Sequence, residues 1–272
     1  MFKKAALLGT VGAALVATSA QAAFNPASGN LIAGFVETTT PSFDIVVDLG
    51  AYTRFTSGSA AILLGGSSVS EAYQGIGPAQ NSENRFASSD ISTTFGDLQS
   101  LLFSVFGVQP NGADNSELFL TRARGVSTQN TQTTPWNRAA ISGQGTTGNN
   151  LVAVPANAIA NGVDFSDTST RESAAGGNSY AAKIPVSGYT AMEANTGTTF
   201  TGATIRRNDL YLLLPGSGPG DFLGYFEYQA DGDLWFIPEN FVPVPEASTY
   251  GLVAGAGLLF MALRRQMGSK TA

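Results

Sequence analysis

Short runs of apolar or alternating residues, separated by turn residues, make up most of the chain between residues 29 and 238. Runs of this kind that are rich in Val, Ile and aromatic residues are typical of β-strands. A β-hairpin is predicted where two such runs flank Asp231-Gly232. The pattern predicts strands at 31–36, 43–49, 117–124 and 210–214, with the two hairpin strands at 222–228 and 234–237.

Helical spacing of apolar residues is clearest between Phe95 and Phe106, where four of them fall on one helical face: Leu98, Leu101, Leu102 and Val105. Thr93 or Thr94 can cap this segment and Gly107 can end it. A second, weaker helix is predicted near Pro135, because proline suits the first position of a helix. The polar stretches 127–134 and 164–178 are predicted to be loops.

These elements predict a mainly β fold: a single sandwich or jelly-roll-like domain, with one packed helix. We place the domain at residues 23–241, between two terminal segments of different character. Its roughly 220 residues are enough to bury a real hydrophobic core.

The N-terminal 22 residues have the three parts of a secretory signal peptide. Lys3 and Lys4 are followed by an apolar run at 5–16, and then by Ala20-Gln21-Ala22. Small residues at Ala20 and Ala22 are the ones that a signal peptidase reads, so cleavage is expected after Ala22. The alternative is an uncleaved N-terminal anchor.

The C-terminal segment 242–272 begins with a proline-stiffened stretch and continues with an uncharged apolar run at 250–263. Arg264 and Arg265 follow at once, and arginines in this position stay on the cytoplasmic side of a membrane. We therefore expect a transmembrane helix at 250–263, with the body outside. Fourteen helical residues span about 21 Å, against about 30 Å of hydrocarbon. Such a short span suits a segment used transiently for sorting.

This segment resembles the PEP-CTERM sorting domain of Gram-negative bacteria. The matching residues are Val244, Pro245, Glu246, Ser248 and Thr249, followed by the apolar run and the two arginines. Ala247 stands where the family has a second proline. The resemblance implies recognition and cutting by an exosortase-type membrane protease, and release into exopolysaccharide or biofilm matrix. The alternative is a plain C-terminal membrane anchor.

The body is similar to a loosely defined set of PEP-CTERM proteins, through two short motifs. These are Gly29-Asn30-Leu31-Ile32-Ala33-Gly34-Phe35 and Val47-Asp48-Leu49-Gly50. The resemblance implies one continuous β-rich domain and brings no activity with it.

Charge and composition exclude several functional classes. Residues 23–245 hold nine Lys and Arg against nineteen Asp and Glu, a net charge of −10, which argues against nucleic acid as a partner. The chain has no Cys and no His, so it can form no disulfide, Ser-His-Asp triad, Cys-His pair or common zinc site. We assign no catalytic residue, no metal ligand and no cofactor.

Three kinds of polar or aromatic feature stay open at this point. Carboxylate pairs could act on glycosides, and those close in sequence are Asp44 with Asp48 and Asp231 with Asp233. Calcium could bind the oxygen-rich stretch that contains Asn111, Asp114, Asn115 and Glu117. Exposed aromatic side chains could stack on sugars, and those considered are Tyr52, Phe55, Tyr73, Trp136, Tyr180, Tyr189 and Trp235.

The sequence thus predicts an exported structural or interaction protein of the cell surface or exopolysaccharide matrix, anchored in the membrane until its tail is processed. Its expected partners are signal peptidase, an exosortase-type protease, the membrane and exopolysaccharide. The alternative is a secreted glycan-binding module or carboxylate glycosidase.

Overall fold

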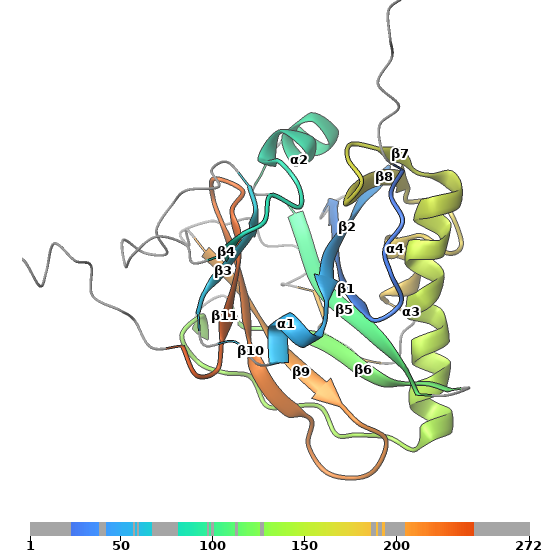
Figure 1. Cartoon of the computed structure of the whole chain (residues 1–272), viewed down its shortest axis with the longest axis vertical. Helices are drawn as coiled ribbons and strands as arrows, with labels where there is room; N and C mark the ends of the chain where they lie inside the picture. The colour runs from blue at the N-terminus through green and yellow to red at the C-terminus, as the bar shows by residue number, and fades with distance from the viewer. Residues whose placement is uncertain are drawn as a thin grey trace, which may run out of the picture.

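The computed structural model describes residues 23–37, 42–56, 58, 60–66, 81–96, 98, 101–111, 114–125, 128–185, 189, 192–193 and 205–241. Within these residues eleven strands form one sheet in the order β4-β3-β11-β10-β9-β6-β5-β1-β2-β8-β7 (Figure 1). Neighbouring strands are antiparallel, apart from the short β3–β4 pair, which is parallel.

The strands are β1 (Asn30–Glu37), β2 (Phe43–Ala51), β3 (Ile62–Gly65), β4 (Asn81–Ser82), β5 (Leu101–Asn111), β6 (Asp114–Ala123), β7 (Val163–Asp164), β8 (Ser169–Ser173), β9 (Ile205–Leu213), β10 (Asp221–Gln229) and β11 (Leu234–Pro238). The helices are α1 (Thr53–Thr56), α2 (Ser88–Phe95), α3 (Ile141–Asn161) and α4 (Tyr180–Lys183).

The sheet curls so that one of its faces closes on itself. The ring of Phe35 in β1 lies 5.7 Å from that of Tyr228 in β10, although three strands separate β1 from β10 in the sheet. Phe55 of α1 enters the same interior and packs against Phe226 and Phe236, at 5.8 and 5.1 Å between ring centroids. These aromatic rings are almost fully buried, so the curled face encloses the main hydrophobic core.

The opposite face of β1, β5, β6 and β9 is covered by α3 and α4 (Figure 1). Leu151, Val154 and Ala158 of α3 are buried against this face, together with Tyr180 of α4. The central strands are therefore buried on both sides.

The mainly β prediction is confirmed, and the predicted strands at 31–36, 43–49, 117–124 and 210–214 are found as parts of β1, β2, β6 and β9. The predicted hairpin is β10–β11, with Gly232 at a φ of 95° in its turn. The strands form one curled sheet, and not the separate pair of sheets that a sandwich has.

The predicted helix over 95–106 is wrong. Helix α2 ends at Phe95, with Gly96 as its left-handed cap, and residues 101–111 form β5. Along β5, Leu101, Phe103 and Val105 face the enclosed core, whereas Leu102 and Phe106 face α3 and α4. A strand buried on both faces is apolar almost throughout, and such a run also satisfies helical spacing.

Two further predictions are corrected. Residues near Pro135 are not helical; Asn137 instead pairs with Pro219, and the packed helix α3 begins at Ile141. The stretch 164–178 holds β8 as well as loop.

Among the described residues, no helix has both the length and the apolar character needed to cross a membrane. The predicted span at 250–263 lies outside them.

Candidate functional site

The residues to which the sequence assigns sorting or processing all lie outside the described residues; they are Ala20, Ala22, Val244, Pro245, Glu246, Ala247, Ser248, Thr249, Arg264 and Arg265. The described chain is well packed close to both ends. Phe24 is 1% exposed and its backbone N–H donates to Asp164 Oδ2 at 3.1 Å. Phe241 packs beside Trp235 and Ile237. Both predicted tails therefore join a firmly held body.

The two motifs of the body meet at one end of the β1–β2 pair. The Asn30 side-chain amide donates to both carboxylate oxygens of Asp48, at 2.9 Å each. Asp48 Oδ1 also accepts the N–H of Gly50, which has a φ of 90°. A β-bulge lies between Leu31 and Ile32 at this point. The motifs thus fix the geometry of the bulge and turn, which is a structural role.

Gly34, also in the first motif, makes room for Tyr180. A Cβ at residue 34 would lie 2.1 Å from the Tyr180 ring. The Tyr180 hydroxyl is in hydrogen-bond contact with Ser104 Oγ, at 2.8 Å. Position 34 therefore permits α4 to sit directly on the sheet.

Two buried carboxylates hold the start of α4. Asp44 in β2 and Glu172 in β8 are directly paired on these neighbouring strands, and they are 0% and 2% exposed. Asp44 Oδ2 accepts the N–H of Ala181 at 2.9 Å, and Glu172 Oε1 accepts the N–H of Tyr180 at 3.1 Å. Glu172 Oε2 also accepts from the Asn157 side chain of α3. The pair clamps two helices to the sheet edge.

Burial dominates the electrostatics of this cluster. It raises the pKa of Asp44 from 3.8 to about 6 and that of Glu172 from 4.5 to about 7, against the opposing effect of their hydrogen bonds. Burial likewise raises the pKa of Glu193 to about 7 and that of Tyr180 well above its usual value. Because the carboxylates serve backbone N–H groups under α4, the geometry is that of a structural clamp and not of a glycosidase cleft.

The carboxylate pairs expected from sequence proximity have separate structural roles. Asp44 holds α4, whereas Asp48 holds Asn30 and Gly50. Asp231 Oδ1 accepts the N–H of Asp233 at 3.2 Å within the β10–β11 turn. In the part of the chain that the structure describes, no three Asp or Glu residues lie close enough together to hold a metal ion.

Of the aromatic residues considered for sugar stacking, Phe55, Tyr180 and Trp235 are buried, and Tyr73 lies outside the described residues. Trp136 and Tyr189 are half-buried and lie together, with 5.4 Å between ring centroids at an angle of 70°. The Arg122 guanidinium lies 5.4 Å from the Trp136 ring. This small aromatic patch combines π-faces with a polar group, as sugar-binding surfaces do.

An apolar groove of about 260 Å³ runs between α3, the segment before β1, and strand β5. Val152 and Ile159 of α3 border it and are 38% and 50% exposed. No ionisable side chain lines it; the lining residues are Pro26, Ala27, Ser28, Gly29, Asn30, Ile32, Phe106, Gly107, Val108, Leu151, Val152, Pro155, Ala156 and Ile159. The groove was not predicted from the sequence, because no helix was expected at the position of α3.

Comparison with known proteins finds no matching family model, no matching curated protein and no matching solved structure.

Proposed function

We propose that the protein is an exported structural or interaction protein of the cell surface or exopolysaccharide matrix, sorted through its C-terminal segment. The observation that carries the interaction role is the apolar groove beside α3, with Val152 and Ile159 exposed at its border. Apolar residues that stay exposed around an uncharged groove are typical of a contact surface. The buried carboxylates, in contrast, are engaged in holding α4, which supports a structural use of the acidic residues.

The sorting role is supported by the sequence of the tail. Pro243 and Pro245 favour an extended segment, which would suit entry into a protease cleft, and Arg264 with Arg265 is expected to keep the far end of the apolar run in the cytoplasm. The test compares the wild type with a Pro245→Ala/Glu246→Ala variant in a host that has exosortase. We expect the variant to stay in the membrane at full length while the wild type is shortened and released. A Gln266→Ala control, beyond the arginines, should behave as the wild type.

The groove is tested separately, on the released protein. Val152→Ser/Ile159→Ser should lower the fraction retained in the washed matrix, because it replaces exposed apolar surface with hydroxyls. Ala160→Ser, on an exposed position of the same helix, is the matched control. Equal retention of the three proteins would remove the groove from the proposal.

A glycan-binding module is the second candidate, and the Trp136–Tyr189 patch favours it. Trp136→Ala should abolish retention on an immobilised glycan if this patch is the contact. The same variant should leave matrix retention unchanged if the α3 groove is the contact.

A further inference from the structure

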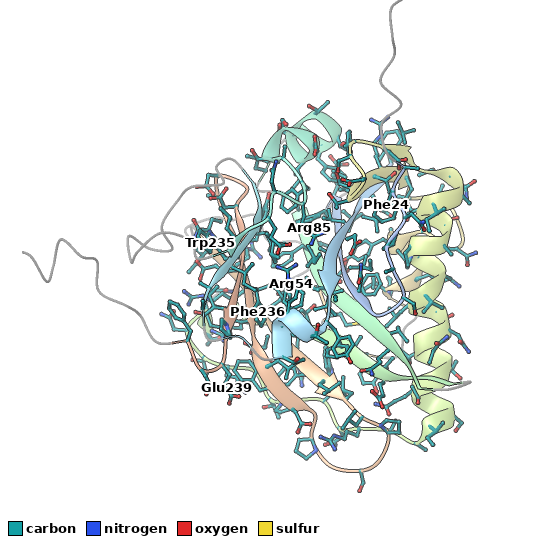
Figure 2. The ribbon with its side chains drawn as sticks, in the orientation of Figure 1. Phe24, Arg54, Arg85, Trp235, Phe236 and Glu239 are labelled. Carbon is teal, nitrogen blue, oxygen red and sulfur yellow. The ribbon has the colours of Figure 1, made fainter. Side chains whose placement is uncertain are left out.

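Two arginines from different elements converge on one carboxylate at the end of β2. Arg54 lies in α1, and Glu83 and Arg85 follow β4. Glu83 Oε2 accepts from Arg54 Nη1 at 2.6 Å and from Arg85 Nη2 and Nε at 2.6 and 2.8 Å. Glu83 Oε1 forms an ion pair with Arg54 Nη2. Figure 2 labels both arginines, which lie near each other beside α1.

The two guanidinium groups are held close together. Nη1 of Arg54 and Nη2 of Arg85 each lie 2.6 Å from the same oxygen, so they are at most about 5.2 Å apart. Arg54 Nη1 also donates to Leu49 O at 3.0 Å. Gly50 gives them space, since a Cβ there would lie 2.8 Å from Arg54 Nη1 and 2.9 Å from Arg85 Nη2. Their position is therefore fixed by the fold.

The cluster of Arg54, Glu83 and Arg85 carries one more positive than negative charge. Two guanidinium groups share one carboxylate, which leaves a net charge of +1 on side chains that are about a quarter exposed. The nearby Asp48 carboxylate forms no ion pair with either arginine; it accepts from the neutral Asn30 amide and Gly50 N–H and keeps its own negative charge. The Glu83 carboxylate already contacts four nitrogens, two from each arginine. Within the described part of the chain, Nη1 of Arg85 has no acceptor, so one edge of this guanidinium is available.

We propose that Arg54 and Arg85 form a binding site for the carboxylate of a small anionic ligand. A guanidinium edge binds a planar carboxylate through two parallel hydrogen bonds, as the contact of Arg54 with the two oxygens of Glu83 illustrates. A monoanion would balance the one surplus charge of the Arg54–Glu83–Arg85 cluster itself. In a body with a net charge of −10, the site provides local attraction for an anion that the rest of the surface repels. The ligand is a free carboxylic acid or an acidic sugar unit.

The test is calorimetric titration of the purified exported protein with acetate, glucuronate and glucose at low ionic strength. We expect saturable binding of a carboxylate, none of glucose, and weaker binding as salt is added. Glucuronate binding tighter than acetate would identify an acidic sugar as the source. Equal binding would identify the carboxylate alone as the recognised group.

Arg85→Gln should weaken carboxylate binding at least ten-fold, and Arg85→Lys should cause a smaller loss because it keeps the charge without the planar fork. Arg138→Gln is the matched control, because Arg138 is similarly exposed and pairs with the single carboxylate of Asp221; it should change binding less than two-fold. Melting temperatures of all variants are measured to confirm folding. Absence of saturable carboxylate binding by the wild type would overturn the proposal. Unchanged binding by a folded Arg85→Gln variant would also overturn it.

Discussion

Replacing Asp44 with asparagine is expected to change the pH dependence of stability. Burial raises the pKa of Asp44 from 3.8 to about 6. A pKa difference of one is worth about 1.4 kcal/mol, so ionising this group in the folded state costs about 3 kcal/mol, as an order of magnitude. Asparagine has no charge to desolvate, and its carbonyl oxygen can still accept the N–H of Ala181.

The direction of this pH dependence follows from the linkage between protonation and folding. The folded state holds the Asp44 proton more tightly than the unfolded state does, so its contribution is fully present below about pH 4 and is lost as the pH rises to about 6. Glu172 behaves in the same way up to about pH 7. The free energy of unfolding of Asp44→Asn relative to the wild type should therefore rise between pH 4 and pH 7, by up to about 3 kcal/mol.

The assay is urea unfolding of the wild type and of Asp44→Asn at pH values from 4 to 8, with the difference in unfolding free energy plotted against pH. Asp221→Asn is the control, because Asp221 is 55% exposed and its pair with Arg138 is screened by solvent. The control difference should stay within about 0.5 kcal/mol at every pH. An Asp44→Asn difference that does not change with pH would refute the clamp and its electrostatics.

Two further predictions concern the fold. Gly34→Ala should destabilise the protein by about 1–3 kcal/mol, because its Cβ would overlap the Tyr180 ring. Gly145→Ala in α3, where a Cβ meets no atom within 4 Å, should stabilise the protein by about 0.5–1 kcal/mol. Urea unfolding measures both changes, and equal effects of the two substitutions would contradict the packing of α4 on Gly34. A protein of residues 23–241 alone should melt in a single transition, since the hydrophobic core lies within them. A circular-dichroism spectrum typical of a disordered chain, recorded on a soluble monomer, would contradict this.

The sequence predicted those strands that show their character locally. The β10–β11 hairpin is predictable because Asp231-Gly232 supplies the turn and the flanking runs supply the strands. Strand β5 is not, because burial on both faces removes the alternation that distinguishes a strand from a helix. Helix α3 contains several glycines and Pro155, so its helical character comes from packing on the sheet and is weak in the sequence.

The sites were less predictable than the strands. Asp44 and Glu172 are far apart in the chain and meet only through the β2–β8 pairing, so no local pattern indicates the clamp. The arginine pair depends in the same way on α1 meeting the segment after β4. In contrast, the absence of His and Cys excludes whole classes of chemistry from composition alone.

Intact-mass measurement of the protein in each cell fraction tests whether the chain is exported and whether its C-terminal segment is removed. We expect the chain found outside the membrane to begin at Ala23, since Lys3, Lys4 and Ala20-Gln21-Ala22 have the pattern of a cleaved signal peptide. We also expect this chain to end near the Val244-Pro245-Glu246 motif and to lack the apolar run at 250–263. An exported chain that retains residues 1–22 would contradict signal-peptide cleavage, and a chain found only in the membrane with its C-terminus intact would contradict processing of the tail.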